Sequence, residues 1–298
     1  MNRRNFTKLA VAGALGSVSG VATAAEEKPP AFKARFGPTF NQLPTAPKGY
    51  LDQLKFAHDL GFRGWEDNWL TRRDRKLWPQ IAEFCRDHDI SLGISVISTG
   101  HGVDFSNPSE GDLAKLKADM AKGITLAKAT GQTCMTFIPG GRNDMPRDEQ
   151  IVKSVDTMNR LCDLIEDSGI ILVLEPVSHP MAKKEPLIRA FADGHLLCKT
   201  VNRKSCKLLA DFYHEGQIGN GDKLIENAEA VWDQVGYIQY GDSPGRKEPG
   251  TGKLDLGAVT KWLRQKNYTG VIGLEHGVKG KGKAGLDAFI AAYRKIDA

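Results

Sequence analysis

A regular alternation of short apolar runs with stretches of helical period is the feature that most constrains the fold of this chain. It begins near residue 33 and continues to the C-terminus. Continuous apolar runs are typical of parallel strands that helices cover on both faces. Eight such runs are predicted strands: residues 34–37, 64–66, 91–97, 134–138, 170–176, 206–212, 236–240 and 271–275.

Between these runs, apolar side chains recur three and four residues apart, which predicts helices with one apolar face. The clearest series are Leu113, Leu116, Met120 and Ile124; Ile151, Val155, Met158, Cys162 and Ile165; and Leu286, Phe289, Tyr293 and Ile296. Eight strand–helix units in roughly 260 residues predict a (β/α)8 TIM barrel, an α/β fold whose strands all end at one active-site mouth. A doubly wound open sheet is the alternative, but no G-x-G-x-x-G motif follows the first strand.

The first 25 residues have the features of an export signal and are excluded from the fold. Arg3 and Arg4 form a twin-arginine run, a mildly apolar segment follows at residues 9–25, and the sequence Ala22-Thr23-Ala24 is a cleavage site. We expect export of the folded protein to the periplasm by the twin-arginine machinery, with no stable membrane insertion after cleavage. An uncleaved anchor is the alternative. The remaining residues, 26–298, contain no Pro/Ser-rich linker and are expected to form a single domain.

Charge and cysteine content exclude several classes of function. Loss of Arg3, Arg4 and Lys8 with the signal lowers the formal charge from +5 to +2, so nothing in the balance favours a nucleic-acid partner. The five cysteines lack CxxC spacing and are expected to be buried small side chains, although one pair in an oxidising compartment stays open. The outer helices of a barrel give no pattern that identifies an oligomer, which remains possible.

Four of the predicted strands end in a polar side chain that a buried strand does not need. These residues are Glu175, Asp211, Gln239 and Glu275. A buried carboxylate costs several kcal/mol unless it is paired, hydrogen-bonded or bound to a metal. Because the carboxyl ends of barrel strands share one mouth, we expect the four side chains to converge there.

Three carboxylates that converge need a positive counter-charge. Arginine or lysine side chains could supply it, and so could a divalent cation. Oxygen ligands from Glu, Asp and Gln suit a hard ion, so we favour one six-coordinate Mn²⁺ or Mg²⁺ with two positions left for substrate. A zinc site of the usual kind is disfavoured, because the sequence has neither clustered cysteines nor an H-E-x-x-H motif.

Other polar residues near these strand ends are candidates for substrate binding. His214 lies three residues after Asp211, Arg246 lies in the loop after the seventh strand, and Glu66 ends the second strand. Each has a structural alternative: Arg246 could pair with Glu248, and Glu66 with a nearby arginine. The two tryptophans near Glu66, Trp65 and Trp69, are expected to pack under the barrel rim.

The motifs "GFRGWED", "LVLEPV", "ADFYH", "QYGDSPGRKEPGTGK" and "GLEHG" together resemble the xylose isomerase-like barrel superfamily, and within it the hydroxypyruvate isomerase family. The resemblance covers essentially all of residues 26–298. It implies that Glu175, Asp211, Gln239 and Glu275 hold the metal and that the two glutamates are the acid/base pair. It also implies that His214 and Arg246 contact substrate.

The reaction implied is proton transfer between adjacent carbons of a small hydroxy-carbonyl compound through an enediolate, an aldose/ketose-type isomerisation. The same residues would serve an epimerase, or a β-eliminating lyase acting on a keto-sugar or oxidised glycoside. The export signal and the sequence Ser178-His179-Pro180 depart from the cytoplasmic isomerases and put the substrate in question. Two other classes stay open. A metal-dependent nuclease is disfavoured, because it would need more histidine ligands than the seven histidines are expected to provide and a more basic surface. The other class is a non-catalytic exported sugar-binding protein.

Overall fold

The computed structural model of the chain describes residues 29–98, 102–180 and 185–298. The predicted export signal, residues 1–25, lies outside the described residues. Strands in this part of the chain are β1 (Arg35–Gly37), β2 (Gly64–Trp65), β3 (Ser91–Leu92), β4 (Val96–Ser98), β5 (Cys134–Phe137), β6 (Ile171–Leu174), β7 (Cys206–Asp211), β8 (Val235–Gln239) and β9 (Val271–Gly273).

The strands form a curled parallel sheet that closes as a barrel. Seven of them pair in the order β1-β9-β8-β7-β6-β5-β4, and β2 pairs with β3. The short β2–β3 ladder fills the gap between β1 and β4 through a parallel bridge of Thr39 with Glu66 and a bond from the Val96 N–H to the Asn68 carbonyl (3.1 Å). The predicted single-domain TIM barrel is thus confirmed.

One predicted strand is divided in two. Residues 91–97 were expected to be continuous, but β3 bonds to β2 and β4 bonds to β5, with Gly93, Ile94 and Ser95 between them. A barrel strand has two neighbours: on one side the Gly93 N–H donates to the Trp65 carbonyl (2.7 Å), and on the other the Ser95 carbonyl accepts from the Thr136 N–H (2.9 Å). Between the two strands, the buried Tyr237 hydroxyl leaves no room for a side chain at Gly93.

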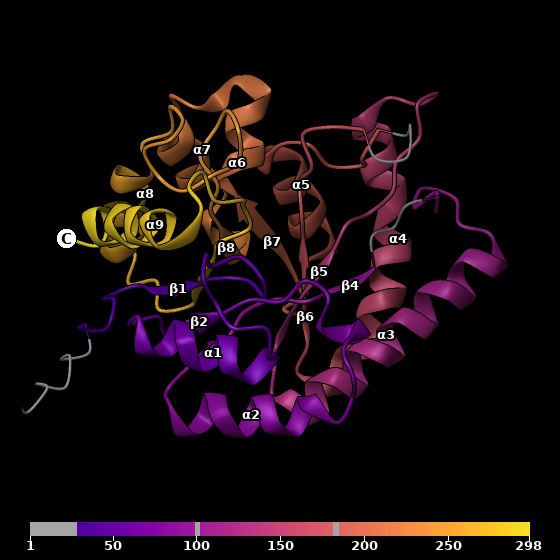
Figure 1. Ribbon diagram of the computed structural model, residues 1–298. Helices are drawn as coiled ribbons and strands as arrows, with labels where there is room; N and C mark the ends of the chain where they lie inside the picture. Colours follow the sequence, from indigo (N-terminus) through magenta and orange to yellow (C-terminus); the bar gives the residue numbers. More distant parts are fainter. Residues whose placement is uncertain (1–28, 99–101, 181–184) are drawn as a thin grey trace, which may run out of the picture.

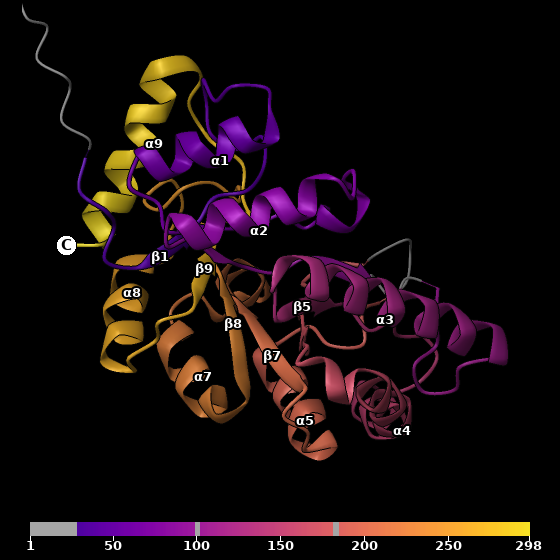
Figure 2. The same cartoon turned by 90° about the horizontal axis from the view of Figure 1, so that it is seen from below.

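Helices surround the barrel on the outside (Figures 1 and 2). The predicted helical series at Leu113, Ile151 and Leu286 lie in α3, α4 and α9, as expected. The bounds are α1 (Tyr50–Asp59), α2 (Leu77–Asp87), α3 (Glu110–Thr130), α4 (Arg147–Ile165), α5 (Phe191–Val201), α6 (Phe212–Glu215), α7 (Leu224–Val231), α8 (Leu256–Gln265) and α9 (Gly282–Ile296). Among the described residues, no helix is both long and apolar enough to cross a membrane.

The barrel interior is filled by one small apolar cluster, separate from the larger core between strands and helices. It consists of Ile94, Val173, Leu209, Tyr237 and Val271, all less than 5% exposed. Side chains two residues apart on a strand share a face, so this cluster defines which residues further along each strand also face inward. The candidate site lies directly above it.

Candidate active site

The two-residue alternation of side chains along a strand turns the four predicted strand-end residues toward the barrel axis. Glu175 follows Val173 by two residues, and in the same way Asp211 follows Leu209 and Gln239 follows Tyr237. Glu275 follows Val271 by four, with Gly273 between them on the same face. Each polar side chain therefore continues an inward-facing row at the carboxyl end of its strand. We call Glu175, Asp211, Gln239 and Glu275 the carboxylate cluster.

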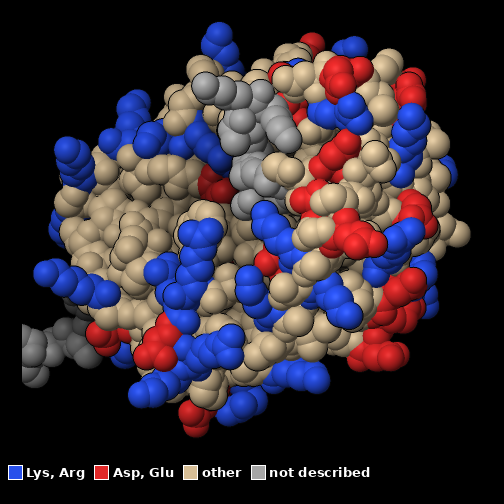
Figure 3. Space-filling model, turned by 90° about the vertical axis from the view of Figure 1, so that its right-hand side faces the viewer, with Lys and Arg blue, Asp and Glu red and all other residues tan. Residues whose placement is uncertain are grey.

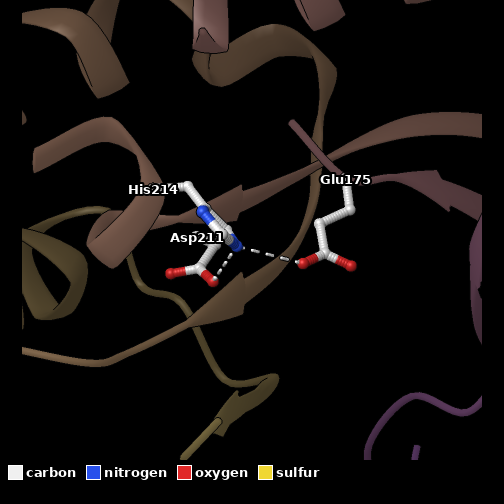
Figure 4. Close-up of side chains that lie close together, drawn as sticks. All are labelled: Glu175, Asp211 and His214. Atoms are coloured by element: carbon white, nitrogen blue, oxygen red, sulfur yellow. Dashed lines mark ion pairs between the residues drawn. The ribbon is translucent and has the colours of Figure 1, made fainter. Parts of the chain in front are cut away.

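Glu175, Asp211 and His214 are nearly inaccessible to solvent and lie close together (Figure 4). The His214 Nε2 atom is 3.7 Å from Glu175 Oε1 and 3.7 Å from Asp211 Oδ2. One ligand atom from each of the three residues lies within 4.8 Å of the others, a spacing that a single metal ion can bridge. His214 reaches this position because Asp211 caps the short helix α6, accepting a bond from the Tyr213 N–H (2.8 Å).

The hydrogen bonds of His214 indicate which of its nitrogens carries the proton. The backbone N–H of Ser178 donates to Nδ1 (3.2 Å), so Nδ1 is an acceptor and the proton of the neutral ring is on Nε2. Burial lowers the pKa of His214 to about 3, which keeps the ring neutral. Its Nε2–H points toward the carboxylates. Such a group donates to an oxygen, whereas a metal bond would need the Nε2 lone pair.

Arg246 joins the two sides of the carboxylate cluster. Its Nη2 donates to Asp211 Oδ2 (2.9 Å) and to Glu275 Oε2 (2.8 Å), and its guanidinium lies 4.7 Å from the ring centroid of Tyr213. These contacts replace the pairing with Glu248 that the sequence left open. Within the described residues, Arg246 is the one lysine or arginine that pairs with the cluster.

Gln239 and Glu66 form a buried pair beneath the cluster. Gln239 Nε2 donates to Glu66 Oε1 (3.1 Å), and the Tyr237 hydroxyl donates to Glu66 Oε2 (2.8 Å). Glu66 is fully buried, and Gly273 makes this possible, because a side chain there would overlap its carboxylate. Neither bond involves an arginine: the neighbouring Arg73 pairs with Asp67. The geometry favours a supporting role for Glu66, and its contact with substrate stays a prediction.

The sequence analysis missed Asn68. Its Nδ2 donates to Glu275 Oε1 (2.9 Å), so Glu275 is held by Asn68 on one oxygen and by Arg246 on the other. The strand period gave no signal for Asn68, because Asn68 lies in the turn that follows the end of β2. The Glu275 side chain is 26% exposed, which leaves it accessible from the barrel mouth.

Electrostatics in the cluster favour additional positive charge. Burial, reinforced by the charge of Glu275, raises the pKa values of Glu175 and Glu66 well above the usual range. Burial also raises the pKa of Asp211, although Arg246 opposes the shift. A single guanidinium thus does not balance the carboxylates around it.

The donor set fits a hard divalent cation. Carboxylate oxygens are available from Glu175 and Asp211, which lie together with His214, and from Glu275, which shares Arg246 with Asp211. The Oε1 atom of Gln239 is buried and has no hydrogen-bond partner among the described residues, because the amide nitrogen is committed to Glu66. A buried, unpartnered carbonyl oxygen beside buried carboxylates is what a metal ligand requires. Glu175, Asp211, Gln239 and Glu275 could therefore hold such an ion.

A cavity of about 350 Å³ opens onto Glu275 and Arg246. We call it the mouth cavity. Its other walls come from the first two strand–loop units and include Phe40, Asn68 and Trp69. A space of this size accommodates a small sugar or hydroxy acid.

Comparison with known proteins places the chain in a family. The model of the xylose isomerase-like TIM barrel matches residues 54–295. The chain belongs to the xylose isomerase-like TIM barrel family.

Curated relatives of this family member have isomerase names. The 2-oxo-tetronate isomerase of Pectobacterium atrosepticum is 25% identical over 86% of this chain and 95% of its own length. The hydroxypyruvate isomerase of Escherichia coli is 26% identical over 56% of this chain and 64% of its own length. The match to a Streptomyces coelicolor relative likewise spans 62% of that protein. An isomerase enzyme is the class that these relatives support.

Solved structures share the fold at low sequence identity. An AP endonuclease family 2 protein from Brucella melitensis has a TM-score of 0.72 at 21% identity, covering 87% of this chain and 98% of its own. The IolI protein, solved with a bound zinc atom, has a TM-score of 0.67 at 19% identity, covering 88% of this chain and 96% of its own. At these identities the likeness concerns the fold.

Proposed function

We propose that the protein is a metal-dependent isomerase of a small hydroxy-carbonyl compound, similar to the hydroxypyruvate isomerases. Three features support this proposal: Glu175 and Asp211 lie close together, Glu275 shares Arg246 with Asp211, and the Gln239 Oε1 atom is buried without a partner among the described residues. Burying several carboxylates together lowers the stability of the folded protein, and a protein that only binds sugar does not need such a group. The family and the names of the curated relatives support the same reaction class.

The proposed cofactor is one divalent cation, Mn²⁺ or Mg²⁺ by the chemistry of its oxygen ligands. The zinc atom in the IolI structure supports metal binding at this kind of barrel without fixing the ion. When bound, the cation would polarise a substrate carbonyl and acidify the neighbouring C–H bond.

The residues of the chain would divide the proton transfer among them. One of Glu175 and Glu275 takes a proton from carbon, and the same or the other glutamate returns it. The Nε2–H of His214 donates to a substrate oxygen next to Glu175 and Asp211. Arg246 fixes the positions of Asp211 and Glu275 relative to each other, because its Nη2 donates to both.

Where the proton returns determines the product. Return to the adjacent carbon is isomerisation, and return to the opposite face of the same carbon is epimerisation. Epimerisation is the second candidate, because relatives of this chain include the 3-dehydro-D-guloside 4-epimerase of Escherichia coli, 23% identical over 80% of this chain. Elimination of a β-substituent after proton loss uses the same residues and is the remaining alternative.

Exchange of a substrate C–H with solvent deuterium in the presence of Mn²⁺ tests this proposal. Hydroxypyruvate, a tetronate and a keto-sugar would be incubated in D₂O and followed by NMR, which also identifies the product. Deuterium incorporation in at least one compound is expected. Binding without incorporation in all of them would contradict the enzyme assignment and favour an exported sugar-binding protein.

We further propose that the protein acts in the periplasm after export in folded form. The Arg3-Arg4 pair and the Ala22-Thr23-Ala24 site support this proposal. Replacing both arginines by lysine should leave the protein in the cytoplasmic fraction, with its signal uncleaved. Unchanged export of that variant would contradict the twin-arginine route.

A further inference from the structure

A second cavity lies next to the mouth cavity and shares Trp69 with it as a wall. Its volume is about 300 Å³. It is bounded by the carboxyl end of β4, by the short 3-10 turn at Leu70–Arg72 and by one face of α3. We call it the distal cavity. Nothing in the reaction described above uses it.

Trp69 connects the distal cavity to the catalytic end. It follows Asn68, whose side chain bonds Glu275. Trp69 was expected to pack under the barrel rim, as the buried Trp65 does, but 42% of Trp69 is exposed. Trp69 therefore lines both cavities, and the exposed part of its indole offers an apolar surface between them.

Arg72 is held in place with its donors free. Its guanidinium carbon lies 4.0 Å from the Trp69 ring centroid, a stacking contact that orders the side chain. In the described part of the chain, no carboxylate pairs with Arg72, and no acceptor takes a bond from its side chain. The adjacent Arg73 differs, because two of its nitrogens bond Asp67 (2.9 and 3.2 Å). An ordered guanidinium without a carboxylate is suited to bind an anion.

The face of α3 adds further positive charge. Lys115, Asp119 and Lys122 follow one another at four- and three-residue spacing, which places them on the same side of the helix. Lys122 pairs with Asp119 (3.1 Å), whereas Lys115 has no acidic partner among the described residues. Three cations and one anion line the cavity. Basic side chains also gather over the left and lower parts of the face of the molecule in Figure 3, while most acidic ones lie in its right half.

We propose that the distal cavity binds an anionic group, a carboxylate or a phosphate, at the far end of a sugar whose carbonyl lies at the carboxylate cluster. This inference rests on the proposed function and narrows its substrate class to acidic sugars. Arg72 and Lys115 would bind the anion, and Trp69 would contact the carbons between its two ends. The catalytic glutamates would not touch this group.

Three ketoses that differ only at C6 test the proposal: D-fructose, D-fructose 6-phosphate and D-fructuronate. Their dissociation constants would be measured by calorimetry on the Mn²⁺-loaded protein, and deuterium exchange would be followed separately. We expect at least one acid to bind about tenfold more tightly than fructose, the increment of a charge-assisted contact. Tighter binding of D-fructose 6-phosphate alone would indicate a phosphate site, and tighter binding of D-fructuronate alone a carboxylate site. Tighter binding of both would indicate a site for either anion.

The variant Arg72→Met/Lys115→Met should reduce this preference to about twofold or less, because both unpaired cations are lost. The matched control is Lys117→Met/Lys128→Met, which removes the same charge from exposed positions of α3 outside the cavity. The control should keep the tenfold preference. A similar loss in both variants would indicate a general charge effect and overturn the proposal.

Binding and exchange separate failure of this inference from failure of the proposed function. No preference for either acid in the unmodified protein, or no measurable binding of either, overturns the distal site. Exchange with fructose would then still support the isomerase. Conversely, no exchange with any ketose contradicts the isomerase, while a preference that depends on Arg72 and Lys115 would still support an anion site.

Discussion

The two halves of the barrel contribute to the candidate site in different ways. Strands β6 to β9 pair side by side in parallel, and charged or amide side chains that face the barrel axis lie at or just after their ends. The half made of β1 to β4 is interrupted, since the two-residue β2 and β3 join their neighbours through isolated bonds. From it come Glu66 and Asn68, which hold Gln239 and Glu275 in place.

The difference teaches that ligands and their supports come from separate parts of the fold. Regular strands fix the direction of each side chain, which suits groups that must converge within a few ångströms. The irregular half brings in polar groups that orient those ligands from below and from the side. If this division is right, substitutions of the strand-end carboxylates should abolish the chemistry, and substitutions of Glu66 or Asn68 should weaken it.

The largest effect is expected for the two glutamates. Glu175→Gln and Glu275→Gln each remove a candidate base while keeping the side-chain shape, so deuterium exchange should fall by about 10²- to 10⁴-fold. Exchange measured by NMR and folding measured by circular dichroism would be compared with Glu149→Gln, a surface change on α4. Unchanged exchange in both variants would refute the acid/base assignment.

The next effect is on stability, and concerns the space that Gly273 in β9 leaves for the Glu66 carboxylate. Gly273→Ala places a methyl group where the Glu66 carboxylate lies, so Glu66 or the backbone of β9 must move. We expect a loss of unfolding free energy of about 1–3 kcal/mol, as for overpacked cores. The control is Gly257→Ala in α8, where a methyl group meets only ordinary contacts. Equal stability of the two variants in urea would show that Glu66 does not need this space.

A smaller effect on Mn²⁺ affinity is expected for Glu66, and a still smaller one for its partner Tyr237. Glu66→Gln leaves one acceptor for two donors, so the amide of Gln239 is no longer held in one orientation. We expect Mn²⁺ affinity to fall about 10- to 100-fold, the usual range for groups that orient a ligand. Tyr237→Phe keeps the hydrogen bond between Glu66 and Gln239 and should lower the Mn²⁺ affinity less. Calorimetry measures both values, and an unchanged affinity in Glu66→Gln would contradict the supporting role.

The smallest effect is expected for Asn68, because Arg246 still holds the other oxygen of Glu275. Asn68→Ala should lower kcat for exchange about tenfold, the value of one hydrogen bond to a charged group, with KM nearly constant. Asn68→Asp should be worse, since it sets a second negative charge against Glu275. The idea fails if KM alone changes, or if the aspartate variant is as active as the unmodified protein.

Sequence patterns predicted the half of the site that lies on regular strands. Glu175, Asp211, Gln239 and Glu275 could be found because each ends a buried run, where period and apolar character leave one direction for the side chain. The sequence also predicted the barrel, because alternating strands and helices of this number have few other solutions.

The irregular half was harder to predict, for physical reasons. The burial of Glu66 depends on Gly273, which is distant in sequence, and on the hydroxyl of Tyr237. Nothing in the segment "GWEDNW" shows that Trp65 is buried while Trp69 is exposed, because that depends on where β2 ends. The division of residues 91–97 likewise follows from which neighbour each residue bonds.

The metal content of the protein tests the central claim most directly. Elemental analysis would be done on protein purified without added metal, beside its Glu175→Gln variant. The account predicts about one divalent ion per chain, most simply Mn or Mg, that is lost or greatly reduced in the variant. Absence of bound metal even after incubation with Mn²⁺ would contradict the account, and would mean that Arg246 alone neutralises the buried carboxylates.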